Sequence, residues 1–142
     1  MPGADALETA LGALRHRELS RQELDERLAR RGFTENDRNE VISTLKRTGL
    51  LDDYRFAEMK AESLAARGAG DALIRDALAR AGVATELAGD ALAALEPEVV
   101  RARPIVERRG ATSKTARYLA GKGFSRETIG GLVASGGTDE IG

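Results

Sequence analysis

The sequence contains no cysteine and only one histidine, and both shortages limit the chemistry open to the chain. Without cysteine there is no disulfide, no thiolate metal site and no cysteine nucleophile. A single imidazole, at His16, argues against zinc sites and imidazole-based active sites. We therefore expect no metal, no cofactor and no enzymatic activity. We interpret His16 as a solvated side chain near a helix end.

Aromatic residues and long apolar runs are also scarce. Aromatic residues make up 4% of the chain, so its core must be built from aliphatic side chains. No apolar run approaches the roughly 20 residues of a membrane-spanning helix. No basic-then-apolar leader is found. These absences predict a soluble, cytoplasmic protein without membrane association.

Alanine, leucine and charged residues are abundant, a composition that favours helix over sheet. Residues 49–58 contain the clearest helix boundary. Gly49 suits the end of one helix, and Asp52 suits the N-cap of the next. Leu51 and Phe56 have the spacing of a hydrophobic staple. We interpret Asp52 and its neighbour Asp53 as architecture, in preference to a metal or general-base site.

Other helix boundaries follow the same rules. The first helix is expected from residue 5 to about residue 17, with Leu7, Leu11 and Leu14 as its apolar stripe. Ser20 and Glu23 have the spacing of a capping box. Pro104 predicts a kink or a late start in its helix. Further helix caps are predicted at Thr34, Ser113 and Ser125.

One pattern recurs three times along the chain. Gly32, Gly82 and Gly123 are each followed by an apolar residue, and each is preceded by a leucine four positions earlier. The spacings between these glycines are 50 and 41 residues. We predict three tandem three-helix repeats, about nine helices in all, in an elongated, curved array. The alternative is one nine-helix globule with similar turns.

Positive charge is concentrated in one segment. Residues 99–126 contain eight basic side chains and one acidic side chain, although the whole chain has a net charge of −1. Such a segment attracts phosphates or an acidic protein groove, or else it is an ordinary solvated helix surface. A second group, Arg27, Arg30 and Arg31, is diluted by nearby acids, and few aromatic residues are available for base stacking. The candidate binding residues are Arg101, Arg103, Arg108, Arg109, Lys114, Arg117, Lys122 and Arg126.

The stretch GLLDDYRFAE, residues 49–58, resembles the most recognisable element of the RecX family of recombination regulators. Residues 14–33, 70–83 and 118–125 resemble the repeated units of that family. The resemblance covers about residues 6–135. Three features depart from the family pattern. Arg38 replaces an apolar residue, Leu73 replaces a basic one, and Pro104, Gly130 and Gly131 are poor helix residues.

We expect helical repeats at 5–49, 50–96 and 97–135, in agreement with the resemblance, and the glycine-containing end at 136–142 is expected to be a flexible tail. The resemblance also implies a regulator that is not an enzyme, and we expect it to be a monomer. Such a protein binds the RecA recombinase on single-stranded DNA and inhibits its ATPase, strand-exchange and coprotease activities. Two alternatives stay open: a helical DNA-binding regulator that acts without RecA, and an adaptor for another protein.

Overall fold

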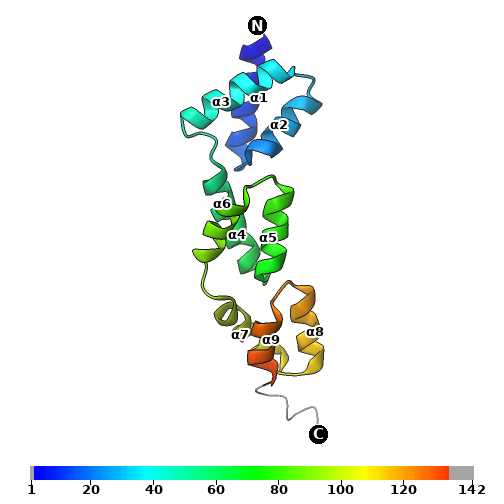
Figure 1. The fold of residues 1–142 in the computed structure, drawn as a ribbon. Coiled ribbons are helices and arrows are strands. Elements are labelled where there is room, and N and C mark those ends of the chain that lie inside the picture. The colour runs from blue at the N-terminus through cyan, green and yellow to red at the C-terminus, as the bar shows by residue number, and fades with distance from the viewer. Residues whose placement is uncertain (1, 135–142) are drawn as a thin grey trace.

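A computed structural model describes residues 2–134, and the expected tail at 136–142 lies outside them. The described part of the chain forms nine helices and no strand (Figure 1). The helices are α1 (Pro2–His16), α2 (Arg21–Arg30), α3 (Glu35–Arg47), α4 (Asp53–Ala66), α5 (Asp71–Arg80), α6 (Thr85–Ala93), α7 (Glu98–Arg109), α8 (Ser113–Gly121) and α9 (Arg126–Val133).

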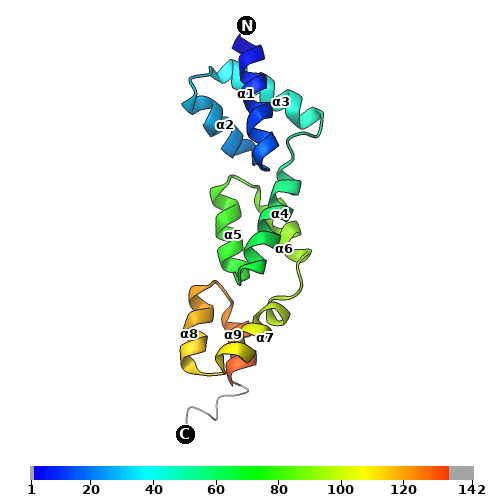
Figure 2. The same ribbon diagram turned by 180° about the vertical axis from the view of Figure 1, so that it is seen from behind.

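The helices group by three into unit one (α1–α3), unit two (α4–α6) and unit three (α7–α9). Each unit encloses its own cluster of buried apolar side chains. In each unit the first and third helices have the most extensive contact. The units follow one another in an elongated column, with α1 at one end and α9 near the other (Figures 1 and 2). The prediction of three tandem three-helix repeats is confirmed, and the single globule is wrong.

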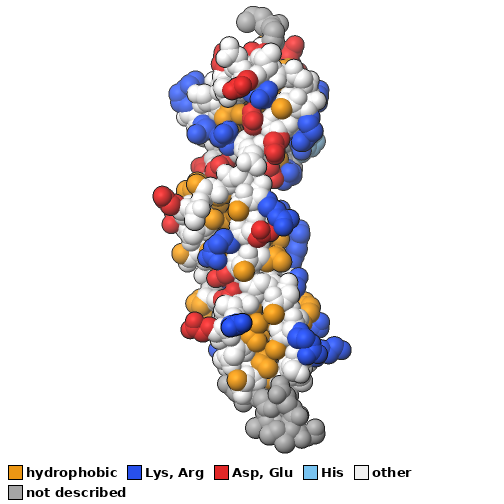
Figure 3. Space-filling model, turned by 45° about the vertical axis from the view of Figure 1, so that its right-hand side comes forward, with side chains coloured by type: hydrophobic (Ala, Val, Ile, Leu, Met, Phe, Trp, Pro, Cys, Tyr) orange, Lys and Arg blue, Asp and Glu red, His pale blue; other side chains and the backbone are white. Residues whose placement is uncertain are grey.

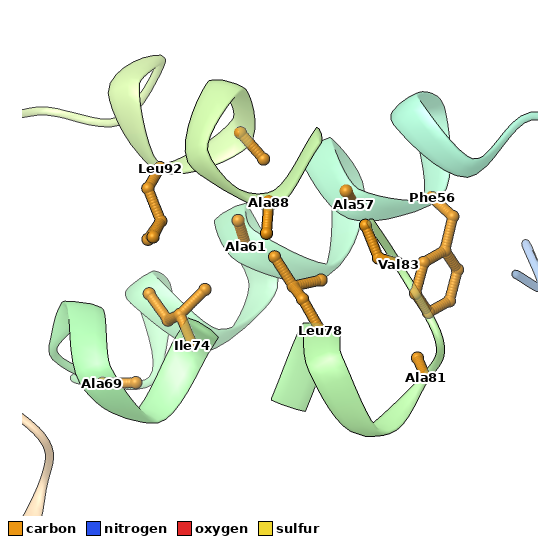
Figure 4. Close-up of a cluster of buried hydrophobic side chains, with 11 residues drawn as sticks. Phe56, Ala57, Ala61, Ala69, Ile74, Leu78, Ala81, Val83, Ala88 and Leu92 are labelled. Carbon is orange, nitrogen blue, oxygen red and sulfur yellow. The ribbon is translucent and has the colours of Figure 1, made fainter. Parts of the chain in front are cut away.

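Small residues bring the helices of each unit close together. In unit two, Ala57 and Ala61 of α4 lie beside Ala88 of α6, and Ile74 and Leu78 of α5 point toward them (Figure 4). All five side chains are at most 3% exposed. Aliphatic side chains thus make up most of this closely packed core, and the prediction of an aliphatic core is corrected at Phe56, a fully buried ring in the same cluster.

The first helix differs from its prediction. It begins at Pro2 and not at residue 5, and its fully buried face carries Ala6 and Ala10. The predicted stripe of Leu7, Leu11 and Leu14 is only partly buried at the edge of the cluster. Alanine faces the core because α1 and α3 pack closely, and a leucine would hold the two backbones apart.

Most of the predicted helix starts are confirmed. Ser20 and Glu23 form the capping box. The Asp52 carboxylate accepts backbone N–H groups of α4, and Thr34 and Ser125 cap their helices. The cap at Ser113 is wrong, because Thr112 caps α8 through the N–H of Thr115. Both hydroxyl residues can cap a helix, and the fold selects the first of them.

The late start predicted from Pro104 is also wrong. Helix α7 begins at Glu98, because the Pro97 carbonyl already accepts the N–H groups of Val100 and Arg101. The helix then continues through Pro104 to Arg109.

Arg38 does not disturb the helix that contains it. Its guanidinium forms an ion pair with Asp25 of α2 at 2.9 Å and donates to the Phe33 carbonyl at 2.7 Å. The arginine therefore joins α2 to the start of α3, a role that an apolar residue at this position would not fill.

Neighbouring units meet in the same way at both junctions. The N-terminus of the middle helix of one unit lies on the turn between the last two helices of the next unit. At the first junction, the Ser20 hydroxyl donates to the Ala81 carbonyl at 2.6 Å, and the Gln22 amide donates to the Arg80 carbonyl at 3.2 Å. Ser20 is fully buried there, so its hydroxyl requires this acceptor.

At the second junction the backbones themselves are in contact. The N–H of Gly70 donates to the Lys122 carbonyl at 2.8 Å, and the N–H of Ala72 donates to the Gly123 carbonyl at 3.1 Å. A Cβ atom on Gly70 would clash with the backbone of Gly123. Glycine at both positions is therefore what allows unit two and unit three to approach this closely.

A carboxylate completes each junction. Asp53, the first residue of α4, accepts the N–H of Arg21 at 2.7 Å. Glu98, the first residue of α7, accepts the N–H of Asp71 at 2.7 Å. In both cases an acidic residue of the following unit caps the middle helix of the preceding unit, where the helix dipole favours negative charge. The repeat thus extends to the contacts between units.

Candidate functional site

The basic segment predicted from the sequence is distributed over all three helices of unit three. Helix α7 buries Ala102, Ile105 and Val106 and carries four of the arginines on its other sides. Six of the eight candidates are exposed to solvent, Lys122 is partly buried, and the side chain of Arg101 is largely buried. The exposed candidates are Arg103, Arg108, Arg109, Lys114, Arg117 and Arg126.

Arg101 is engaged in the junction between units two and three. Its side chain is 10% exposed and forms an ion pair with Asp71. It also donates to the Ala69 carbonyl at 2.9 Å and to the Glu96 carbonyl at 3.0 Å. These contacts occupy its guanidinium and hold α7 against the start of α5. Arg101 therefore has a structural role at the junction and its guanidinium is not free to bind a partner.

In the part of the chain that the structure describes, the other seven basic side chains lack carboxylate partners. Within residues 2–134, Arg101 is the only one of the eight candidates that forms an ion pair. In the same segment the single acid, Glu107, is exposed. Uncompensated positive charge on a solvated surface attracts anionic partners and raises their association rate.

One aromatic ring lies within this basic surface. The guanidinium carbon of Arg109 lies 3.6 Å from the ring centroid of Tyr118, and this cation–π contact joins the end of α7 to α8. Tyr118 nevertheless remains 38% exposed. Although the chain has few aromatic residues, one partly exposed ring therefore lies within the basic surface.

A cleft of about 260 Å³ opens between units two and three. Its charged lining consists of Arg67, Arg101 and Arg108, with Tyr118 beside them, and no acidic side chain of residues 2–134 lines it. The other lining residues are small or apolar. Arg67 was missed in the sequence because it lies outside the basic segment, directly after α4.

A second basic cleft, of about 350 Å³, lies in unit one between α1 and α2. Its lining includes Arg15, His16, Arg27 and Arg31, together with Glu8. Figure 3 shows Lys and Arg side chains along the right-hand edge over all three units, with the single histidine among them in unit one. Positive charge therefore follows the long axis of the molecule, beyond unit three.

Glu98 links unit two to the start of α9 in unit three by accepting hydrogen bonds from three groups. One carboxylate oxygen accepts the N–H of Asp71; the other accepts the N–H of Ser125 at 3.0 Å and the Thr128 hydroxyl at 2.8 Å. Burial by itself would raise the pKa of Glu98. The hydrogen bonds from Ser125, Asp71 and Thr128 outweigh burial and lower that pKa below its ordinary value of 4.5. The carboxylate is therefore charged at neutral pH.

The remaining candidate features have structural partners. Asp52 accepts the N–H of Tyr54 at 2.9 Å and that of Arg55 at 3.1 Å, and Asp53 caps α2. Among residues 2–134 no group of three or more acidic or histidine side chains is arranged to hold a metal ion. Over the same residues, no helix is long and apolar enough to cross a bilayer.

The comparisons with known proteins agree on one family. The model of the first three-helix domain of RecX matches residues 6–45, and the model of the second matches residues 52–92. The "Regulatory protein RecX" of Halorhodospira halophila is 32% identical over 143 residues, which cover 94% of this chain and 89% of that protein. The protein of the same name from Chromohalobacter salexigens is 34% identical over 129 residues, covering 84% of this chain and 85% of that protein.

A solved structure has the same fold. The crystal structure of RecX from Lactobacillus salivarius superposes with a TM-score of 0.84 and covers 94% of this chain and 96% of that chain. The two sequences are 22% identical, so this similarity concerns the fold alone.

Proposed function

The chain belongs to the RecX family, and we propose that it regulates the RecA recombinase by binding the RecA filament on single-stranded DNA. Binding inhibits the ATPase, strand-exchange and coprotease activities of RecA. In this proposal the protein catalyses no reaction itself. It acts as a cytoplasmic monomer of 15.1 kDa, a mass that sedimentation equilibrium can check.

The observation that carries this proposal is the unpaired positive surface of unit three, on a chain of this family. Seven basic side chains there have no carboxylate partner within the described residues. A filament of recombinase on DNA offers two anionic targets, the phosphates and the acidic parts of the protein surface. Contacts of this kind weaken as salt concentration rises, because bound counterions are released on association.

The elongated shape supports binding to a repeating target. Three units with separate cores form a column joined by two similar junctions (Figure 1). A column of this kind reaches further than one compact domain of equal mass and contacts successive protomers of a filament. If it binds one conformation of the filament better than another, it holds the filament in that conformation and slows ATP turnover.

A matched pair of double variants tests the surface. The changes Arg108→Glu and Arg109→Glu reverse two exposed charges in the last turn of α7. The changes Lys46→Glu and Arg47→Glu do the same in the last turn of α3. We expect the α7 variant to bind the RecA–DNA filament roughly tenfold or more weakly, a loss of about 1.4 kcal/mol. The α3 variant should bind nearly as well as the original chain.

Circular dichroism provides the control, because both variants should keep their helicity. Equal losses of binding in the two variants would mean that net charge, and not the surface of unit three in particular, determines binding, and would contradict the proposed interface. Tight, salt-sensitive DNA binding with unchanged RecA activity would favour a regulator that acts without RecA. Recovery of another protein and no RecA in a pull-down would favour an adaptor.

A further inference from the structure

We infer that the cleft between units two and three binds one nucleotide of a single-stranded nucleic acid, with the base on Tyr118 and the phosphate between Arg67 and Arg108. This inference deepens the proposed function, because it assigns the DNA part of the contact to a particular site. It also adds unit two to the interface, through an arginine outside the basic segment.

The charge of the cleft suits a phosphodiester. Arg67 comes from the end of α4 and Arg108 from the last turn of α7, so the two lie on opposite units. Both are exposed, and neither forms an ion pair within residues 2–134. Guanidinium groups bind phosphate oxygens with paired N–H donors, which makes arginine well suited to phosphate recognition.

Tyr118 supplies the second element of nucleotide recognition. The Arg109 guanidinium carbon lies 3.6 Å from the ring centroid and so covers one face of the ring, yet Tyr118 is 38% exposed and lines the cleft. A base can stack on the part of the ring that Arg109 leaves open. Stacking on an aromatic side chain beside a positively charged groove is the usual combination in proteins that bind single strands.

The cleft is held open before any ligand arrives. Arg101 forms its floor and is fixed by Asp71 and two backbone carbonyls. Backbone hydrogen bonds from Gly70 to Lys122 and from Ala72 to Gly123 tie the two units together beside it. The backbone and Arg101 are therefore fixed in advance, which reduces the conformational entropy lost when a ligand binds.

The combination of charge and ring favours a single strand over other anions. An acidic peptide would use the arginines and leave the Tyr118 ring without a role. The bases of a duplex are already stacked on one another and do not reach a tyrosine ring without unpairing. A single strand offers both an accessible base and a phosphate at each position.

The sequence itself provides a spectroscopic test. The chain has two tyrosines and no tryptophan, so the change Tyr54→Phe leaves Tyr118 as the only strong fluorophore. We expect oligothymidylate to quench the fluorescence of this variant as it binds, whereas an abasic oligonucleotide should bind with little quenching. Binding of oligothymidylate, detected by anisotropy of a labelled strand, without any quenching of Tyr118 would overturn the inference.

Substitutions give an independent readout in the same anisotropy assay. Tyr118→Ala should weaken binding of oligothymidylate about tenfold, and Tyr118→Phe should retain it, because stacking needs only the ring. Tyr54→Ala is the matched control, since Tyr54 is also 38% exposed but lies near the first junction. Equal losses for Tyr118→Ala and Tyr54→Ala would contradict the assignment. Arg67→Ala should lower the salt dependence by about 0.7 in log–log slope, the amount expected for one phosphate contact.

These measurements use no RecA, so they separate this inference from the proposed function. Quenching of Tyr118 without any effect on RecA would support the cleft and reject filament regulation. Inhibition of RecA that is unaffected by Tyr118→Ala, with no quenching of Tyr118, would support filament regulation and reject the nucleotide-binding cleft. Quenching by thymidine monophosphate as strong as that by the oligonucleotide would assign the cleft to a free nucleotide and overturn the single-strand inference.

Discussion

Replacing Glu98 by Gln tests the junction on which the surface of unit three depends. Both carboxylate oxygens of Glu98 are in use, one by the N–H of Asp71 and the other by the N–H of Ser125 and the Thr128 hydroxyl. A glutamine amide has only one oxygen acceptor, and its NH2 group cannot accept an N–H. In either orientation of the amide, one side of the junction loses its hydrogen bond.

The expected cost follows from these contacts. A hydrogen bond to a charged group contributes about 1.5–3 kcal/mol, against roughly 1 kcal/mol for a neutral one. The substitution removes one charged bond and makes the remaining ones neutral, and Glu98 is only partly buried. We therefore expect the free energy of unfolding to fall by about 2–3 kcal/mol at neutral pH. The melting temperature should fall by roughly 5–10 °C.

The pH dependence distinguishes this mechanism from a simple packing defect. The pKa of Glu98 is lowered in the folded state by its hydrogen bonds, against the effect of burial, so folding favours the carboxylate. The stabilisation is complete above the ordinary pKa of 4.5 and is lost as pH falls through the lowered value. Urea unfolding followed by circular dichroism should show a difference between the two proteins that narrows as the pH falls toward 3.

Glu107→Gln is the matched control, because Glu107 is an exposed acid on the same helix. It makes the same change in net charge and should alter the free energy of unfolding by less than about 0.5 kcal/mol. The reasoning would be refuted if the two variants lost equal stability, or if the effect of Glu98→Gln stayed constant from neutral to acid pH.

Two further substitutions test the junctions by thermal unfolding. Gly123→Ala should destabilise the protein by about 1–3 kcal/mol more than Gly32→Ala. Both positions have positive φ, but only at Gly123 would the new Cβ lie 2.6 Å from the backbone nitrogen of Leu73. Equal melting temperatures of the two variants would contradict this expectation. Ser20→Ala should cost about 2 kcal/mol, since it removes a helix cap and leaves the Ala81 carbonyl without its 2.6 Å donor. A loss below about 0.5 kcal/mol would mean that another group replaces the hydroxyl.

The features of the fold that depend only on residues a few positions apart in the sequence could be predicted from it. Caps at Ser20, Thr34, Asp52 and Ser125 require only a side-chain oxygen and the next few backbone N–H groups. The repeat was visible for the same reason, because each turn needs a glycine with positive φ, and Gly32, Gly82 and Gly123 all have one. These caps mark the starts of α2, α3, α4 and α9, whereas α5, α6 and α7 begin without a side-chain cap.

The buried face of α1 could not be read from periodicity. Ala6, Ala10 and Leu7, Leu11 have the same helical spacing, shifted by one residue, and hydrophobicity favours the leucines. The close approach of α3 makes the alanine face the buried one, and that distance is a property of the packed unit. The choice of Thr112 over Ser113 as helix cap is a similar one-residue ambiguity.

The candidate site could be predicted only in part from the sequence, for a related reason. The concentration of positive charge is a property of the sequence, but the role of each arginine depends on contacts between distant segments. Arg101 bonds to Asp71, thirty positions earlier, and Arg67 reaches the cleft from another unit. The junction carboxylates Asp53 and Glu98 likewise cap helices that precede them by 32 and 27 positions. No local pattern contains these pairings.

ATP hydrolysis by the RecA–single-stranded DNA complex is the most direct test of the proposal that this chain regulates RecA. The RecA–DNA complex is titrated with the purified chain while hydrolysis is followed. The account predicts a progressive fall in the rate as the chain approaches stoichiometric amounts with RecA, and a much weaker fall with the Arg108→Glu and Arg109→Glu double variant. Hydrolysis that stays unchanged at and beyond stoichiometric amounts would contradict it.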